Sequence, residues 1–338
     1  MKKLTFVGQN ITNMPWEDRP KGFDGPVWRY SKNPIIGRNP AKGITRIFNS
    51  AVVYEDGEYV GVFRAEDYST LPNLRFGKSK DGINWKIDDH TLKIVDEDGS
   101  PVHLYYAYDP RITKVGDTFH IMYCTDMHGP TIGLITTKDF KTFVRRENPF
   151  IPFNRNAVMF PEKINGVYKM LSRPSDSGHT PFGDIFISDS PDLVHWGRHR
   201  HVMQSGGHGW WQGTKIGAGP TPIKTSEGWL MIYHGVTTTC NGLVYSMGAA
   251  LLDLEQPSKV RYRSKNYILT PELPYEEVGF VPNVLFPCAA LVHEDGRMAI
   301  YYGAADSYVA LSFTTVPELV KYIIDNNEIV GSDRELGR

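Results

Sequence analysis

The stretch "NSAVVYEDGEYVGVFRAED", residues 49–67, has the pattern of two strands joined by a tight turn. Runs rich in Val and Tyr lead into and out of Asp56-Gly57. Asp-Gly is a strong hairpin signal, because glycine adopts the positive φ of such turns without steric cost. The stretch therefore predicts an antiparallel β-hairpin.

Four later segments repeat this pattern of strand, Gly-containing turn, strand, loop and third strand. The five turn glycines follow one another at intervals of 50 to 68 residues, at Gly57, Gly116, Gly166, Gly228 and Gly296. A repeat of this kind indicates units that stack to bury a shared core. Five small sheets arranged radially would bury their faces against each other. We therefore expect an all-β chain folded as a five-bladed β-propeller, with a two-sheet sandwich as the alternative.

The repeat also sets the expected boundaries. We expect one catalytic domain over residues 1–338, with blades at roughly 49–87, 107–145, 155–198, 217–263 and 287–315. The apolar spacing of Leu319, Tyr322 and Ile323 predicts a short C-terminal closing helix at 316–328. Blade loops gather at one end of the central channel, which is the expected binding face.

Composition narrows the range of functions. A net charge of −1 creates no field that would attract nucleic acid or a membrane surface. Three widely separated cysteines give neither a disulfide framework nor a zinc ribbon. The N-terminus has no apolar run, and no stretch is long enough to span a bilayer. We expect a cytoplasmic protein without a metal or a membrane partner, and a homo-oligomer is left open.

The stretch "YAYDPRIT", residues 106–113, places a carboxylate where a strand would not favour it. Asp is depleted in strands, and Pro cannot donate to a β-ladder. The register of the repeat explains the exception, because the inner strand of each blade lines the channel. Asp109 is then expected at the mouth of the channel.

Basic residues recur at matching positions of the other blades. The expected set at the hub contains cations opposite Asp109 and Asp306, namely Arg64, Arg155, Arg173, Lys215 and His234. Like charges stay together only when an anion lies among them, and Arg binds phosphate or carboxylate in a bidentate manner. The alternative is that each arginine pairs with an Asp or Glu on the rim.

At these residues the chain resembles glycoside hydrolase family 130, the β-mannoside phosphorylases. The resemblance covers about residues 30 to 325 and rests on stretches such as "YDPRIT", "NRNAVMFPEKI", "WWQGTKIGAGPTPI" and "VPNVLFPC". It implies a five-bladed propeller that performs inverting phosphorolysis. A β-1,4-mannooligosaccharide or mannosyl disaccharide and phosphate would give α-mannose-1-phosphate and a shortened acceptor.

The resemblance also implies roles for individual residues. Asp109 matches the acid of the family, whose proton is expected to pass through a hydroxyl of the mannose. The phosphate-binding residues match Arg155, Arg173, Lys215 and His234. The substrate-binding residues match Asn49, Ser50, Arg64, Tyr108, Asn156, Tyr245, Asn283 and Asp306. No cofactor is expected, since inorganic phosphate is a co-substrate.

Elementary chemistry supports a phosphorylase. An inverting hydrolase needs an acid for the leaving oxygen and a base for water. A phosphorylase needs only the acid, together with cations that hold phosphate in line. The alternatives are a β-mannoside hydrolase on the same propeller and a non-catalytic sugar-binding propeller. The acceptor (mannose, glucose or N-acetylglucosamine), the β-1,4 or β-1,2 linkage, the preferred chain length and the oligomeric state are left open.

Overall fold

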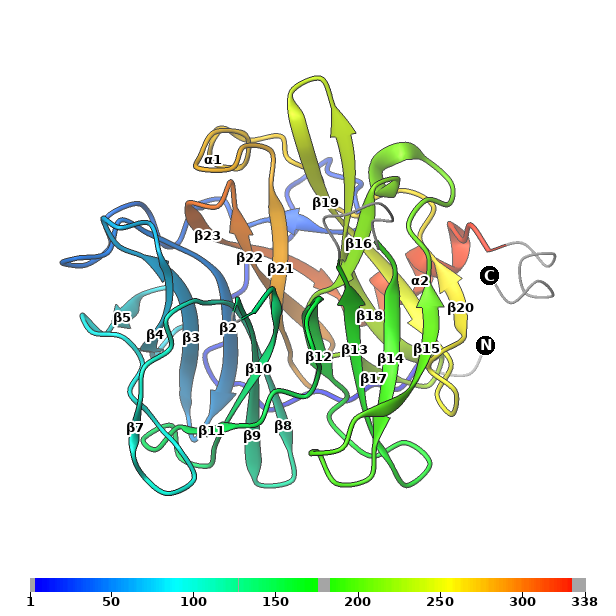
Figure 1. Cartoon of the computed structure of the whole chain (residues 1–338). Helices are drawn as coiled ribbons and strands as arrows, with labels where there is room; N and C mark the ends of the chain where they lie inside the picture. The colour runs from blue at the N-terminus through cyan, green and yellow to red at the C-terminus, as the bar shows by residue number, and fades with distance from the viewer. Residues whose placement is uncertain (1–3, 127, 176–182, 330–338) are drawn as a thin grey trace.

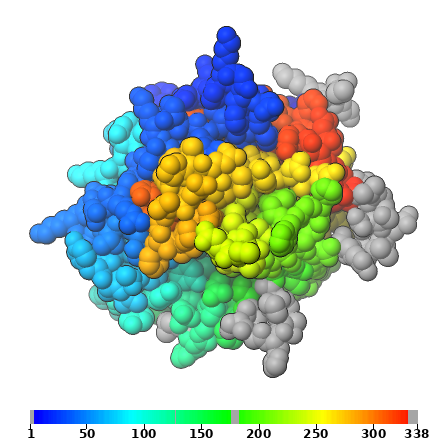
Figure 2. All heavy atoms as spheres, turned by 90° about the horizontal axis from the view of Figure 1, so that it is seen from above, coloured from blue at the N-terminus to red at the C-terminus, as the bar shows by residue number. Residues whose placement is uncertain are grey.

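The computed structural model describes residues 4–126, 128–175 and 183–329, so residues 176–182 of the expected third blade lie outside the described residues. It contains five sheets arranged radially around a central channel (Figure 1). Seen from above, the chain runs round the molecule from blue through cyan and green towards red (Figure 2). The prediction of a five-bladed propeller is confirmed.

Each sheet is described from its inner to its outer strand. The first contains β2 (Arg46–Glu55), β3 (Glu58–Glu66), β4 (Pro72–Ser79) and β5 (Trp85–Ile87). The second contains β8 (Ala107–Val115), β9 (Thr118–Thr125), β10 (Thr131–Thr137), β11 (Val144–Arg146), β6 (Ile94–Val95) and β7 (Pro101–Val102). The third contains β12 (Asn154–Met159), β13 (Tyr168–Pro174), β14 (Ile185–Ser190) and β15 (Gly197–Met203).

The fourth sheet has an interrupted inner strand. It contains β16 (Lys215–Ala218) and β17 (Ile223–Thr225), which both pair with β18 (Gly228–Thr239), then β19 (Gly242–Leu252) and β20 (Val260–Arg263). The fifth contains β21 (Leu285–Val292), β22 (Arg297–Ala304), β23 (Tyr308–Thr315) and β1 (Trp28–Arg29). The helices are η1 (Trp210–Gln212), α1 (Pro274–Glu277) and α2 (Val316–Asp325). Every helix among the described residues is too short or too polar to cross a membrane.

The two ends of the chain meet at the fifth blade. β1 pairs antiparallel with β23 through Trp28 and Phe313, so a strand from the N-terminal region completes the last sheet. The expected C-terminal helix is α2, which buries Leu319 and Ile323 against the cluster shared by the fourth and fifth blades. A two-residue strand such as β1 carries no periodic signal, which is why the repeat did not predict it.

The core consists of apolar clusters between neighbouring blades. Val62 of the first blade and Ile121 of the second belong to one cluster. Leu171 of the third blade and Tyr233 of the fourth belong to another. Each buried Å² of apolar surface contributes about 25 cal/mol, so a blade without its neighbours would lose this stabilisation.

Three inner strands carry the same irregularity near the channel mouth. The β-ladder shifts register at Asn49 in β2, at Asp109 in β8 and at Asn156 in β12. Their φ angles are 49°, 50° and 55°, in the left-handed region. Asn and Asp tolerate this region better than other residues with a Cβ. Because a β-bulge re-aims a side chain, three polar side chains occupy equivalent positions at the mouth of one channel.

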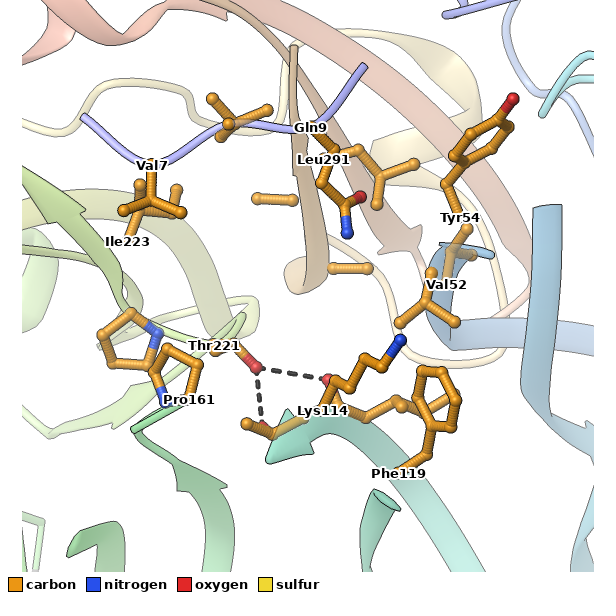
Figure 3. A pocket seen from close by; sticks show the side chains of 18 of the residues that line it. Val7, Gln9, Val52, Tyr54, Lys114, Phe119, Pro161, Thr221, Ile223 and Leu291 are labelled. Atoms are coloured by element: carbon orange, nitrogen blue, oxygen red, sulfur yellow. Dashed lines mark hydrogen bonds between the residues drawn. The ribbon is translucent and has the colours of Figure 1, made fainter. Parts of the chain in front are cut away.

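A second space lies at the opposite end of the channel. A cavity of about 370 Å³ is lined by the later residues of β2, β8 and β21 and by the N-terminal segment. In that segment Val7 donates to the carbonyl of Lys224 at 3.0 Å, and Gln9 donates to that of Val292 at 2.8 Å. Figure 3 shows Val7 and Gln9 on one side of this cavity and Phe119 on the other. Most side chains that line this space, the lower cavity, are apolar. The channel mouth at the other end instead carries the polar side chains of Asn49, Asp109 and Asn156.

Candidate active site

Asp109 is buried at the channel mouth and is 7% exposed. Its Oδ1 accepts hydrogen bonds from Asn49 Nδ2 at 2.8 Å and from Arg64 NH1 at 3.0 Å. Among the described residues no group bonds to Oδ2. The carboxyl group is therefore held firmly by one oxygen, which leaves the other for a proton or a ligand.

Arg64 joins Asp109 to a second carboxylate. Its NH2 donates to Glu66 Oε1 at 3.0 Å, and Glu66 also pairs with Arg46. The guanidinium lies over the ring of Phe48 at 4.3 Å. Burial disfavours the charge, but the neighbouring carboxylates outweigh burial and raise the pKa of Arg64 above its ordinary value. For this arginine, pairing with protein carboxylates is what the structure shows.

Asp306 lies on the same side of the hub. Its φ is 45°, again in the left-handed region. Burial, reinforced by the charges of Asp109 and Glu66, raises the pKa of Asp306 to about 7, although Arg64 and Arg46 act in the opposite direction. Near neutral pH this carboxyl group can both donate and accept a hydrogen bond, which suits contact with a sugar hydroxyl.

Arg155 and Arg173 face each other across β12 and β13. Arg155 Nε donates to the hydroxyl of Tyr108 at 3.1 Å. Arg173 donates from Nε to Ser175 Oγ at 3.2 Å and from NH1 to the carbonyl of Ile216 at 3.3 Å. Neither guanidinium forms an ion pair with a carboxylate in the part of the chain that the structure describes.

Lys215 completes the group of cations. Its Nζ lies 5.3 Å from the centre of the Tyr245 ring and has no carboxylate within ion-pair distance among the described residues. Burial and then the charges of Arg173 and Arg155 lower the pKa of Lys215 to about 8. Arg155 disfavours the charge of Arg173, and both disfavour that of Lys215, so an anion bound among them would relieve this repulsion.

His234 reaches the site as a neutral base and not as the cation that the sequence suggested. The ring is fully buried, and its Nε2 accepts from Arg173 NH1 at 3.2 Å. It packs on the ring of Phe286 at 4.5 Å. Burial, and then the charges of Arg173, Arg111 and Lys215, lower the pKa of His234 well below its ordinary value. The imidazole therefore orients Arg173.

Asn156 supports the same arginine from the left-handed position of β12. With the amide oriented by its partners, its oxygen accepts from NH1 and NH2 of Arg173 at 3.0 and 3.1 Å. A Cβ at Gly217 would lie 2.6 Å from the amide group of Asn156 and 2.5 Å from His234 Cε1. Gly217 is thus required for this arrangement, a role that the sequence did not reveal.

The acid side has a matching glycine. A Cβ at Gly303 of β22 would overlap the amide oxygen of Asn49, which holds Asp109. A glycine inside a strand often marks such a close approach, and this is the signal by which both positions could have been found.

The remaining predicted residues differ in their access to the hub. Tyr108 and Tyr245 border the cations, and the carbonyl of Asn283 accepts from the main chain of Tyr245 at 2.9 Å. Ser50 is different, because its hydroxyl is buried without a partner among the described residues. The bulge places the amide of Asn49 beside Asp109, and the expected contact of Ser50 with a sugar stays a prediction.

In the described residues, one firmly held acid and a group of cations without carboxylate partners lie at the mouth of a five-bladed propeller, and this arrangement fits the class of glycoside phosphorylases. Comparison with known proteins identifies the family. The model described as "beta-1,4-mannooligosaccharide phosphorylase" matches residues 8–325, and the chain belongs to this family, glycoside hydrolase family 130.

Relatives within the family act on different linkages. A β-1,4-mannooligosaccharide phosphorylase of Ruminococcus albus is 50% identical, over 97% of this chain and 100% of its own length. A β-1,2-mannobiose phosphorylase of Listeria innocua is 39% identical, over 72% of this chain and 66% of its own. A solved structure of the β-1,2-mannobiose phosphorylase from Listeria innocua, in complex with β-1,2-mannobiose, aligns with a TM-score of 0.77 and 30% identity. It covers 88% of this chain and 99% of that one.

Proposed function

We propose that this protein is a β-1,4-mannooligosaccharide phosphorylase. It cleaves a β-mannosidic bond with inorganic phosphate and releases α-mannose-1-phosphate and a shortened oligosaccharide. The observation that carries this proposal is the group of three cations, the buried Arg173 with the partly buried Arg155 and Lys215, without carboxylate ion-pair partners among the described residues. The choice of the β-1,4 linkage rests on the similarity to the enzyme of Ruminococcus albus.

The geometry suggests how the work is divided. Arg155, Arg173 and Lys215 hold phosphate, with Asn156 and His234 keeping Arg173 in place. A phosphate oxygen attacks the anomeric carbon from the face opposite the leaving sugar, so the configuration inverts. The bond from that carbon to the glycosidic oxygen breaks, and this oxygen receives the proton that Asp109 supplies, directly or through a sugar hydroxyl. The cations offset the negative charge of the attacking phosphate.

The mannosyl unit would lie on the other side of the hub. Asn49 and Arg64 hold Asp109, and Asp306 offers a carboxyl group that can exchange hydrogen bonds with a hydroxyl. Tyr108, Tyr245 and Asn283 border the space left for the acceptor sugar. All three cysteines are free thiols, which fits an enzyme of a reducing compartment such as the cytoplasm.

A hydrolase on this propeller would need a carboxylate base that activates water. Glu66 is paired with both Arg46 and Arg64, so it is not free to activate a water. A hydrolase would also leave Arg155, Arg173 and Lys215 without a role. These observations favour phosphate as the nucleophile.

The test is to incubate the protein with β-1,4-mannobiose and β-1,4-mannotriose, with and without inorganic phosphate. We expect mannose-1-phosphate only when phosphate is present, and little turnover of β-1,2-mannobiose. Free mannose at equal rates with and without phosphate would instead identify a hydrolase. Sugar binding without turnover would identify a non-catalytic propeller.

A further inference from the structure

Arg111 lies directly beneath the site and has no part in the reaction described above. It follows Asp109 by two residues in β8 and is only 1% exposed. Of the residues in "YDPRIT", sequence reasoning assigned a chemical role only to Tyr108 and Asp109. A buried guanidinium at this depth needs partners, because burying an unpaired polar group costs free energy.

The partners of Arg111 are main-chain carbonyls of two different blades. NH1 donates to the carbonyl of Asp109 at 2.8 Å. NH2 and Nε donate to the carbonyls of Ala218 and Gly219 at 3.3 and 3.4 Å. The second blade thus supplies Asp109, while Ala218 and Gly219 follow Lys215 in the fourth. One planar group joins the strand of the acid to the strand of a phosphate-site lysine.

The charge of Arg111 is not neutralised by the protein. In the described ranges, 4–126, 128–175 and 183–329, no carboxylate forms an ion pair with it. Its Cζ lies 5.0 Å from the centre of the Phe286 ring, the same ring that packs on His234. Its field extends into the anion site, because it is among the charges that lower the pKa of His234, after burial and Arg173.

We propose that Arg111 is a positioning residue that sets the placement of Asp109 relative to the phosphate site, and that its buried charge adds to the attraction for phosphate. The inference rests on the proposed phosphorylase activity. Its two parts are separable, since the first depends on the shape of the guanidinium and the second on its charge.

A second link joins the same two blades below Arg111. Thr113 Oγ1 and Thr221 Oγ1 are 2.7 Å apart, and Thr221 also donates to the carbonyl of Ile112 at 3.2 Å. Figure 3 shows Thr221 at the lower cavity, with dashed lines that start from its hydroxyl group. Blades two and four would therefore remain connected when Arg111 is replaced. Thr221 also offers a matched control, because it joins the same strands away from the acid and the cations.

The experiment compares Arg111→Lys, Arg111→Met and Thr221→Val with the wild-type protein. Two quantities are measured: kcat on β-1,4-mannotriose at saturating phosphate, and the Kd of inorganic phosphate for the sugar-free protein by calorimetry. Lysine keeps the charge but lacks the planar fork that reaches three carbonyls. We expect Arg111→Lys to lower kcat by about 30-fold, the scale of a displaced catalytic group, and to change the phosphate Kd by less than about threefold.

Arg111→Met removes the charge as well as the fork. We expect a similar loss of kcat and, in addition, a phosphate Kd raised by about tenfold, because a nearby positive charge in a site of low dielectric is lost. Thr221→Val should lower the Tm and leave both kcat and the phosphate Kd within about twofold, since it removes a neutral hydrogen bond outside the site.

Each outcome tests either the positioning role of Arg111 or the role of its charge. A kcat of Arg111→Lys within twofold of wild type would refute the positioning role, even if the Tm fell, because a merely structural role predicts that pattern. Equal phosphate Kd values for the Lys and Met variants would refute the role of the charge. If Arg111→Met does not fold, Arg111→Gln takes its place in the phosphate measurement. If the wild type makes no mannose-1-phosphate, the proposed function and the positioning role fall together, while the phosphate Kd values still decide the role of the charge.

Discussion

The two sides of the hub treat charge in opposite ways. The acid side consists of Asn49, Arg64, Glu66, Asp109 and Asp306, and the anion side consists of Asn156, Arg155, Arg173, Lys215 and His234. On the acid side Arg64 is bonded to two carboxylates. On the anion side none of the three cations forms an ion pair with a carboxylate of the described residues, and the arginines donate to neutral groups such as the Tyr108 hydroxyl and the Ile216 carbonyl. The protein completes one side itself and leaves the other for a ligand.

This difference has an energetic consequence. A buried charge without a partner costs several kcal/mol, so the anion side is destabilising until an anion binds. A ligand that binds only the folded state stabilises it by mass action. The anion side therefore exchanges stability of the empty protein for affinity, whereas the acid side holds one carboxyl group in place whether or not a ligand is bound.

The largest expected effect comes from replacing Asp109, the acid of the acid side. Asp109→Asn keeps the shape and an acceptor oxygen for Asn49 and Arg64 but cannot supply a proton. We expect kcat to fall by about 10³-fold, within the range typical of a lost general acid, with little change in the phosphate Kd. Steady-state kinetics and calorimetry measure the two quantities. Asp117→Asn, in the exposed turn after β8, is the matched control. Activity of Asp109→Asn near that of the control would remove Asp109 as the acid.

The next prediction compares how a lost cation on each side of the hub changes the free energy of unfolding. Arg64→Met leaves Asp109 without its cation and leaves Glu66 with Arg46 alone, so we expect the free energy of unfolding to fall by about 3–5 kcal/mol. Lys215→Met removes a buried cation that has no ion-pair partner among the described residues, and the phosphate-free protein should be as stable as wild type or more stable. Denaturation with urea in phosphate-free buffer measures both. Equal losses for the two variants would contradict the division of the hub into a paired and an unpaired side.

The repeat in the sequence was sufficient for the fold, because hairpin turns such as Asp56-Gly57 are local and their period marks each blade. It also brought the right residues to one hub, since equivalent positions of a radial repeat converge. β1 could not be predicted from the sequence, for a physical reason. Its two residues gain their structure only from β23, across most of the chain.

Three details of the hub depend on features that the spacing of residues in a sequence does not report. Whether Asn49 or Ser50 faces the channel depends on a one-residue shift of the ladder, which reverses the side-chain direction. The charge of His234 depends on its complete burial beside Arg173, which sequence spacing does not report. Arg111 was overlooked because its partners are main-chain carbonyls, and these have no signature in a sequence.

The third prediction sharpens the comparison through pH. The pKa of Lys215 is lowered to about 8 in the empty site, so the lysine is losing its proton above that pH. A bound phosphate favours the charged form and raises this pKa again, so binding above pH 8 takes up a proton. Phosphate affinity should therefore weaken as the pH rises past about 8, by up to about tenfold per pH unit. Calorimetry at pH 8.5 to 9, in two buffers of different ionisation enthalpy, would show the uptake.

Lys215→Met is the control for this prediction and should show no such uptake. The direction of the effect on protein stability also follows, because the pKa of Lys215 in the folded protein lies below its unfolded value near 10.5. The unfolded state binds more protons between about pH 8 and 10.5, so this group contributes a gain in stability as the pH rises through that window. Uptake that persists in Lys215→Met would assign the proton to another group.

The smallest expected effect concerns the neutral partner on the anion side. In His234→Gln the amide oxygen can still accept from Arg173, so we expect the phosphate KM to rise only about two- to tenfold, the scale of one perturbed hydrogen bond. Because burial lowers the pKa of His234 well below its ordinary value, a neutral imidazole has no charge to lose near pH 6.5, and the pH dependence of the phosphate KM should keep its shape in the variant. A cationic His234 would instead add a loss of affinity near pH 6.5 in the wild type that disappears in His234→Gln. Phosphate itself titrates in this range, so neither pH profile is informative alone. The difference between the profiles of the wild type and His234→Gln decides whether the imidazole acts as a charge or as a support for Arg173.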